Sequence, residues 1–183
     1  TSFKEFQGEW EKVLSVSPAN TLFLTPQWQE VWWEIFGNGK EMAGFYLGSA
    51  EEVMGIAPLA RSGTTLSFLG NTDTVDYNDF MITPGHETVF FDTLLDSMEE
   101  QACSTLKLLS LRETSPTLTY LPDLARRRGY SVVVEEEDVA SGLELPSTWE
   151  GYLSGLSKKD RHELRRKFRR LESSTNWRWY CLH

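Results

Sequence analysis

The stretch that decides the fold is residues 42–69, MAGFYLGSAEEVMGIAPLARSGTTLSFL. It contains three short runs with strand character, 42–48, 53–60 and 64–69, which Gly, Ser and acidic residues separate. Punctuated apolar runs of this length are typical of consecutive strands. We therefore expect these three runs to form an antiparallel meander. A fourth run, 74–82, changes the phase of its apolar residues midway, which predicts a bulge or bend.

Helices are expected on both sides of this region. Apolar residues at helical spacing predict a helix over 3–15, and Thr25-Pro26 predicts the start of a second one that ends at Gly37. Downstream, the same criteria predict a helix over 86–103, a strand over 106–111, a helix from Ser115-Pro116 to Gly129 and a buried strand over 130–134.

Length and composition limit the class of protein. The chain has 183 residues, of which 40 % are apolar and 13 % aromatic, enough for a hydrophobic core. No apolar run approaches the roughly 18 residues that span a bilayer, so we expect no transmembrane segment. The start resembles no signal peptide, and two cysteines form no disulfide framework, which favours a cytoplasmic protein. The missing initiator Met indicates a piece of a longer chain.

The net charge of −9 hides a strong asymmetry. Up to Ser157 the chain carries 24 acidic and 9 basic side chains, whereas from Lys158 onward it carries 3 acidic and 9 basic ones. An acidic body repels nucleic acid, and a basic segment attached to it attracts anions or the body itself. We expect no nucleic-acid partner, because no recognition motif accompanies the basic segment.

The basic segment belongs to the clearest helical pattern of the chain. Ser147 and Glu150 form a capping box, and apolar residues then follow one stripe as far as Leu171. We expect a long basic connector helix over 147–173, followed over 174–183 by a strand that opens a missing second domain.

Several landmarks resemble the CelD/BcsL-like acyltransferases, a family named after a cellulose-biosynthesis protein. They occur in order along nearly the whole chain: Phe23-Leu24-Thr25-Pro26-Gln27-Trp28, Trp32-Trp33, Gly55-Ile56-Ala57-Pro58-Leu59, Phe68-Leu69-Gly70 with Asp76-Tyr77-Asn78-Asp79, Leu145-Pro146 with Trp149-Glu150-Gly151-Tyr152-Leu153, Leu156-Ser157-Lys158-Lys159-Asp160-Arg161 and Leu164-Arg165-Arg166-Lys167.

The resemblance implies an α+β, GNAT-like fold with a mixed, mainly antiparallel sheet flanked by helices. Residues 1–146 would form the N-terminal GNAT-like domain of a two-domain enzyme related to FemAB-type transferases. Such an enzyme moves an acyl group from acetyl-CoA or another acyl-CoA to an amine or hydroxyl, with a polysaccharide or cell-envelope precursor as one acceptor class. The resemblance does not identify the acceptor.

The residues themselves argue against a CoA site in this half. A GNAT domain binds the CoA pyrophosphate with backbone N–H groups of a glycine-rich loop between its fourth strand and the next helix. Here that junction reads Ile82-Thr83-Pro84-Gly85-His86-Glu87, in which Pro84 lacks an N–H and Glu87 brings negative charge. We expect no cofactor in this fragment, no activity of the fragment alone, and acyl-CoA bound by the missing half.

Two short segments supply candidate substrate-binding residues. Asp76, Tyr77 and Asp79 lie near the bend of the fourth run, where they either orient an acceptor or form a polar edge bonded to the backbone. A carboxylate here could act as a general base if burial raised its pKa. Arg112 follows a strand, a place where sheets bind ligands, although a surface ion pair with Glu113 is the alternative. No catalytic residue and no metal ligand is assigned.

Lys158, Arg161 and Arg165 complete the candidates, since they share one face of the expected connector helix. A basic helix of this kind has three possible functions. It could bind nucleic acid, bind a membrane surface, or act as a connector that lines a cleft for an anionic substrate or the CoA phosphates. We favour the connector.

Two function hypotheses follow. The first is the acceptor-side half of an acyltransferase, with the missing C-terminal half and a small-molecule or saccharide acceptor as partners. The alternative is a catalytically inactive GNAT-like module that binds or scaffolds partners. A homodimer of the fragment stays open.

Overall fold

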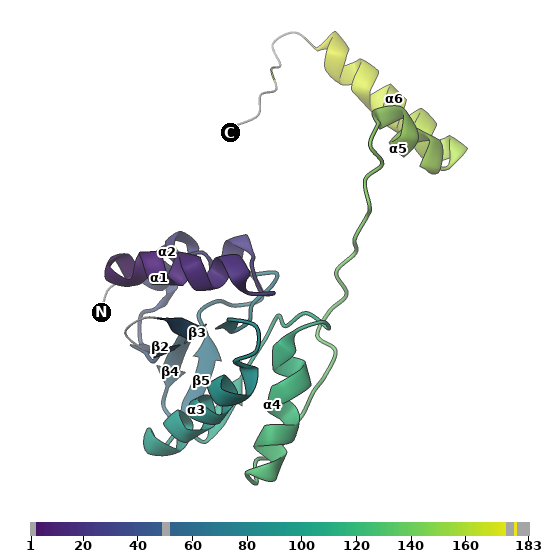
Figure 1. The fold of residues 1–183 in the computed structure, drawn as a ribbon. Helices are drawn as coiled ribbons and strands as arrows, with labels where there is room; N and C mark the ends of the chain where they lie inside the picture. The colour runs from purple at the N-terminus through teal and green to yellow at the C-terminus, as the bar shows by residue number, and fades with distance from the viewer. Residues whose placement is uncertain (1–2, 49–51, 175–177, 179–183) are drawn as a thin grey trace. The chain divides into compact units, whose positions relative to one another are not determined.

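The computed structural model describes residues 3–48, 52–174 and 178, and the chain divides into two compact units, Thr1–Glu137 and Asp138–His183. Figure 1 shows the helices and sheets of the first unit and the helical second unit. The fold class is α+β, with antiparallel and mixed sheets flanked by helices. No described helix has the length and apolar character needed to cross a membrane.

Four α-helices and one 3₁₀ turn belong to the first unit: α1 Phe3–Val16, η1 Leu22–Leu24, α2 Pro26–Phe36, α3 Glu87–Glu100 and α4 Pro116–Arg127. Two of their starts follow the predicted capping chemistry. Thr25 Oγ1 accepts the Trp28 N–H at the start of α2, and Ser115 Oγ accepts the Thr117 N–H at the start of α4. The predicted starts of both helices are therefore confirmed.

The strands form two hydrogen-bonded groups. They are β1 Glu41–Met42, β2 Phe45–Gly48, β3 Val53–Ala57, β4 Leu59–Ser62, β5 Thr65–Phe68, β6 Met81–Ile82 and β7 Thr105–Lys107. One sheet has the order β1-β4-β5-β7 and the other the order β2-β3-β6. Every pair is antiparallel except β5 with β7, which is parallel.

The two sheets share one long hairpin that Pro58 interrupts. Glu41 pairs with Arg61 and Phe45 with Ala57, so both halves of the hairpin have the same register. Proline has no N–H to donate to the ladder, which explains the break between β3 and β4. Beyond Pro58 the chain continues into β5, so the three predicted runs do pair consecutively in antiparallel fashion.

The main core of the first unit lies between the sheets, α3 and α4. Phe90 and Phe91 are completely buried and contact each other edge to face at 5.5 Å between ring centroids. A second cluster under α1 joins Trp10, Val13 and Leu14 to Met81. These contacts fix β6 between the two clusters and so position the loop that precedes it.

Two strand predictions were wrong, and a third was too long, since the strand predicted over 106–111 is Thr105–Lys107. Within 74–82 only Met81–Ile82 is a strand, because the preceding residues form a loop held by side-chain hydrogen bonds. Residues 130–134 have no ladder partner and form no strand; Val133 is 75 % exposed. High β-propensity is not enough for a strand when no neighbour is present to pair with it.

The second unit corrects the prediction of one long helix over 147–173. It contains two helices, α5 Trp149–Gly155 and α6 Lys158–Ser173, because Leu156 has extended backbone. Ser157 caps α6: its Oγ accepts the Asp160 N–H at 3.2 Å and donates to the Asp160 carboxylate at 2.7 Å. This reciprocal cap starts a new helix instead of continuing the old one.

Aromatic contacts hold the two helices of the second unit together. Trp149 lies 5.4 Å from both Tyr152 and Phe168, measured between ring centroids, and Leu153 is buried. Residues 138–147 link the units without helix or strand. Apart from Ser174 and Arg178, the strand predicted over 174–183 lies outside the described residues and stays a prediction.

Candidate functional site

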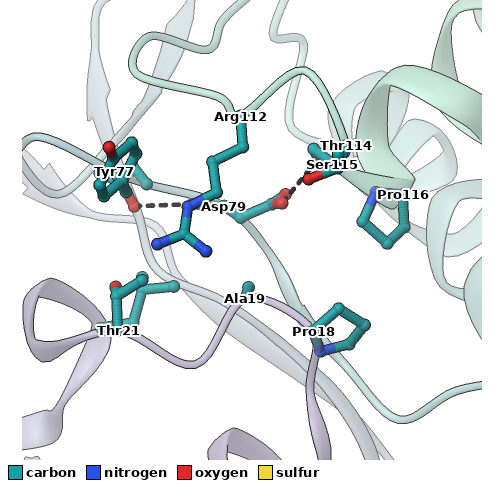
Figure 2. A pocket seen from close by; sticks show the side chains of 11 residues that line it. Pro18, Ala19, Thr21, Tyr77, Asp79, Arg112, Thr114, Ser115 and Pro116 are labelled. Carbon is teal, nitrogen blue, oxygen red and sulfur yellow. Dashed lines mark hydrogen bonds between the residues drawn. The ribbon is translucent and has the colours of Figure 1, made fainter. Parts of the chain in front are cut away.

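A small pocket lies where two loops leave the parallel strands β5 and β7. One loop runs from Leu69 to Phe80 after β5, and the other from Leu108 to Ser115 after β7. The carboxyl ends of parallel strands meet at one edge of a sheet, which is the usual place for ligands in such sheets. The pocket volume is about 40 Å³. Figure 2 shows its lining, which includes Pro18, Ala19 and Thr21 from the segment after α1.

Asp79 is the buried carboxylate of this pocket, with 6 % of its surface exposed. It accepts three hydrogen bonds: from Ser115 Oγ at 2.6 Å, from Thr117 Oγ1 at 2.5 Å and from the Phe80 N–H at 2.8 Å. Burial raises the pKa of the Asp79 carboxyl above its ordinary value, while these hydrogen bonds and the nearby Arg112 charge oppose the rise.

The three donors define what Asp79 does. They engage both carboxylate oxygens and tie the pocket loop to the first turn of α4, where a negative charge also suits the helix dipole. A general base needs a free lone pair directed at the proton it removes. Asp79 is therefore placed to position the start of α4. Its hydrogen bonds fill both lone pairs of Oδ1 and one of Oδ2, so a single lone pair on Oδ2 is left to accept a proton.

Arg112 lies at the rim of the pocket. The guanidinium carbon lies 4.2 Å from the centroid of the Tyr77 ring, a close cation–π contact. Arg112 is exposed, and no described residue forms a hydrogen bond or ion pair with its side chain. The ion pair with Glu113 that was considered as an alternative is absent among the described contacts. The guanidinium is thus restrained by a ring, and its N–H donors have no partner among the described residues.

Asn78 anchors the loop from inside. It is 4 % exposed; its Nδ2 donates to the Leu69 carbonyl at 3.0 Å and its Oδ1 accepts the Asp79 N–H at 3.1 Å. Gln29 of α2, which is fully buried, donates to the same Leu69 carbonyl at 3.3 Å. A single carbonyl therefore connects α2 to the pocket loop.

Ser110 connects the second loop to the first. Its backbone has a φ of 62°, in the left-handed region, which non-glycine residues adopt at a cost of about 1–3 kcal/mol. Its carbonyl accepts the Asn78 N–H at 2.9 Å, and its Oγ donates to the Val75 carbonyl at 3.3 Å. This strained conformation, beside the pocket, is maintained by contacts between the two loops.

The structure brings together three of the predicted site residues, Tyr77, Asp79 and Arg112, which all line this pocket. Asp76 is exposed and is not part of the lining. Lys158, Arg161 and Arg165 lie on α6 in the second unit and are not part of the lining either; Arg161 donates to the Leu156 carbonyl at 3.3 Å. The role of all seven in substrate binding stays a prediction.

Sequence reasoning missed the partners that hold the pocket together. Ser115 was recognised only as a helix cap, and Thr117 was not singled out at all, although both are buried and both donate to Asp79. The signal was available in part, since a Ser and a Thr in the first turn of a helix offer hydroxyl donors at one place. The sequence does not show that folding brings Ser115 into contact with Asp79, which lies 36 residues earlier in the chain.

At the junction before α3 a backbone N–H is bonded to a carboxylate of the chain itself. Gly85 has a φ of 93°, and its N–H donates to the Glu87 carboxylate at 3.0 Å. Pro84 contributes no N–H. This contact supports the prediction that residues 82–87 do not bind a pyrophosphate.

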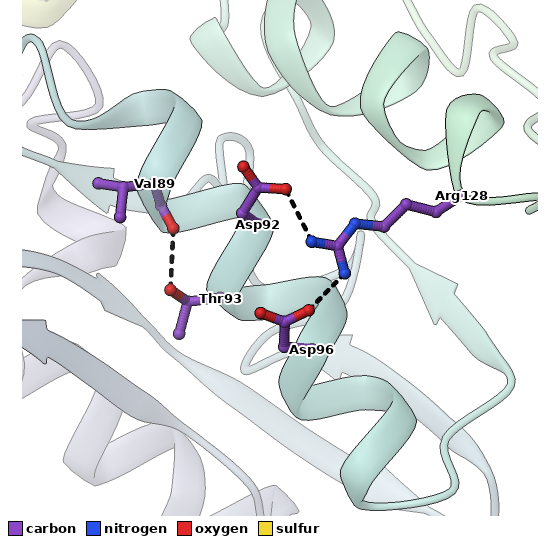
Figure 3. A network of polar contacts seen from close by, with 5 residues as sticks. All are labelled: Val89, Asp92, Thr93, Asp96 and Arg128. Atoms are coloured by element: carbon purple, nitrogen blue, oxygen red, sulfur yellow. Dashed lines mark hydrogen bonds and ion pairs between the residues drawn. The ribbon is translucent and has the colours of Figure 1, made fainter.

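The position of α4 is also fixed at its far end. Arg128 donates to the carboxylates of Asp92 at 2.8 Å and of Asp96, both on α3 (Figure 3). These charge-assisted hydrogen bonds raise the pKa of Arg128. The contacts join α3 to α4 and so support the loop that begins α4.

Comparisons with known proteins leave the identity open. Neither a family model, nor a curated protein, nor a solved structure matches this chain. Among the described residues, no group of three or more His, Cys, Asp or Glu side chains is placed to hold a metal ion.

Proposed function

We propose that this chain is the acceptor-side half of an acyltransferase with two GNAT-like domains, and that the pocket beside Tyr77, Asp79 and Arg112 binds the acceptor. The reaction would transfer the acyl group of an acyl-CoA to an amine or hydroxyl. The acceptor's N or O forms a bond to the thioester carbonyl carbon, the C–S bond breaks, and CoA leaves as the thiol with the acceptor's proton. A cytoplasmic location is part of the proposal.

The observation that carries this proposal is the position of the pocket at the carboxyl ends of β5 and β7. Polar side chains from two loops that are far apart in sequence line this pocket. They include the cation of Arg112 and the buried carboxylate of Asp79. The mixed sheet with helices around it is compatible with the fold that the family resemblance implies. An acceptor would find here both hydrogen-bonding groups and a rigid support.

The donor side is expected elsewhere. Because Glu87 occupies the Gly85 N–H, the junction before α3 presents a negative charge instead of an anion site. The acyl-CoA is therefore assigned to the second GNAT-like half.

One observation favours the alternative, a binding module without catalysis. Three of the four lone-pair sites of the Asp79 carboxylate already accept hydrogen bonds, so the carboxylate is used mainly to hold the pocket together. In that case the same pocket binds a ligand, and the protein catalyses no acyl transfer.

A transfer assay with the product of the complete gene separates the two hypotheses. Acetyl-CoA is supplied with a panel of amine and hydroxyl acceptors, and the released thiol is measured. The acyltransferase proposal predicts acceptor-dependent thiol release, and it predicts that Arg112→Met raises the KM for the acceptor while the KM for acetyl-CoA is unchanged. Arg127→Met, which removes an exposed arginine on α4, is the matched control. No thiol release by the folded protein above the uncatalysed hydrolysis of acetyl-CoA would support the binding module.

A further inference from the structure

The guanidinium of Arg112 has the geometry of a receptor for a flat anion. The guanidinium carbon lies over the ring of Tyr77 at 4.2 Å from its centroid, and a contact this close restrains the guanidinium while its N–H donors stay free. Those donors have no hydrogen-bond or ion-pair partner among the described residues. Two parallel N–H groups in such a fork match the two oxygens of a carboxylate.

Asp79, the nearby carboxylate, does not occupy this fork. Its negative charge acts on Arg112 through space, but its two oxygens are directed to donors on Ser115, Thr117 and the Phe80 backbone. The Asp79 carboxylate is thus bonded to the start of α4. The Arg112 guanidinium is left able to bind the anion of a ligand.

A second observation on the same pocket points to a missing acceptor of hydrogen bonds. Thr21 lines the side of the pocket across from Arg112 and Tyr77 (Figure 2), and its Oγ1 is buried without a partner among the described residues. Buried hydroxyls are normally hydrogen-bonded. An anionic oxygen in the pocket would give this hydroxyl an acceptor.

Size and charge select the kind of anion. A cavity of about 40 Å³ is small, so only the head of a ligand enters. The chain up to Ser157 carries 24 acidic and 9 basic side chains, which disfavours a phosphate dianion more than a monoanion. A carboxylate fits both limits.

We propose that Arg112, held against Tyr77, binds the carboxylate of the acceptor, so that the acceptor is a carboxylate-bearing molecule such as an amino acid or a sugar acid. This inference rests on the proposed function in one respect, which is that the bound carboxylate belongs to the acceptor of an acyl group. The anion site itself stands on the geometry of the pocket alone.

The test uses this chain without any acyl donor. The side-chain Nε–H resonance of Arg112 is followed by NMR while sodium acetate is added at constant ionic strength, with sodium phosphate and sodium chloride as parallel titrations. The expected result is a saturable shift with acetate at concentrations on the order of millimolar, weaker with phosphate and absent with chloride. A stronger response to phosphate, or an equal and unsaturable response to all three salts, overturns the proposal.

Variants assign the effect to the fork and its support. Arg112→Lys keeps the charge but loses the planar fork, and Tyr77→Leu removes the ring; each is expected to weaken acetate binding about tenfold, read from backbone amides of the pocket loop. Arg127→Lys is the matched control and should leave binding unchanged. If Arg112→Lys binds acetate as well as the original chain does, the fork plays no part and the proposal is wrong.

The two proposals fail separately. Acetate binding without acyl transfer by the complete gene product removes the acyltransferase and keeps the carboxylate site as part of a binding module. Acyl transfer to acceptors that lack a carboxylate, with no response of Arg112 to acetate, keeps the acyltransferase and removes the carboxylate site.

Discussion

The hydroxyl of Ser115 donates a hydrogen bond of 2.6 Å to the carboxylate of Asp79, 36 residues earlier in the chain. The same Ser115 oxygen accepts the Thr117 N–H that begins α4. One side chain therefore caps a helix and fixes a loop at once. The pocket depends on this contact for its shape, which makes it the first place to test.

Asp79→Asn is expected to destabilise the fold by about 1–3 kcal/mol, because the new amide group faces the hydroxyl donors of Ser115 or Thr117 where an acceptor stood. Urea denaturation measures the change in the free energy of unfolding. Asp76→Asn is the control, since Asp76 is exposed and its replacement should stay within about 0.5 kcal/mol. Equal effects of the two variants would contradict the structural role of Asp79.

The stabilising contribution of Asp79 should depend on pH. Burial raises the pKa of its carboxyl above the ordinary 3.8, so between 3.8 and the raised value the folded protein holds a proton that the unfolded chain has released. The contribution is fully present below 3.8 and is lost as pH rises through the raised pKa. The difference in free energy of unfolding between the original chain and Asp79→Asn should shrink from pH 3.8 toward neutral pH. A difference that grows with pH would show a lowered pKa instead.

This chain should not bind acetyl-CoA with micromolar affinity. The N–H of Gly85, in the junction where the resemblance would put the pyrophosphate, already donates to Glu87 at 3.0 Å. Calorimetric titration with acetyl-CoA is the measurement, and heat of saturable binding in the micromolar range would refute the assignment of the donor site to another domain. The acetate titration proposed above serves as the positive control for a responsive pocket.

Gly55→Ala should destabilise the core. A Cβ at this position of β3 would lie 2.5 Å from Cδ2 of Phe90, which is completely buried, so the expected cost is about 1–3 kcal/mol. Gly8→Ala makes the same chemical change in the exposed part of α1, where a Cβ meets nothing within 4 Å. There the better helix propensity of Ala should add about 1 kcal/mol. Urea denaturation of both variants should give shifts of opposite sign.

Arg128→Met should lower the midpoint of thermal unfolding, because it leaves Asp92 and Asp96 on α3 without their shared cation. Since partly exposed ion pairs are screened by salt, the difference from the original chain should decrease at about 1 M sodium chloride. Arg127→Met removes the neighbouring, exposed arginine and should have little effect. No difference between the two variants at low salt would mean that the contacts of Arg128 with Asp92 and Asp96 contribute nothing to stability.

Local chemistry made part of this fold predictable. Thr25-Pro26 and Ser115-Pro116 gave the starts of α2 and α4, because capping acts over three residues and needs no partner elsewhere. Arg112 was selected from its position after a strand, and Tyr77 and Asp79 from the bend expected in the run 74–82; the three line one pocket. A strand end is a local feature, and parallel pairing brings two such ends together.

Pairing itself is not local, and here prediction failed. The run at 130–134 has the composition of a buried strand but no partner, whereas the two-residue β6 is a strand because β3 pairs with it. The break between α5 and α6 was a different failure. The apolar stripe continues past Ser157 and Asp160 and so predicted one helix, whereas the hydrogen bonds between these two residues begin a second one.

The Leu69 carbonyl accepts hydrogen bonds from both Gln29 and Asn78, and this restricts how the loop from Leu69 to Phe80 can evolve. Both of its lone pairs are engaged, so a substitution at either amide leaves the other in a changed environment. Gln29 does not line the pocket, yet selection for a new ligand that alters Asn78 acts on α2 as well. Specificity in this protein is expected to change through coupled substitutions in two distant segments of the chain.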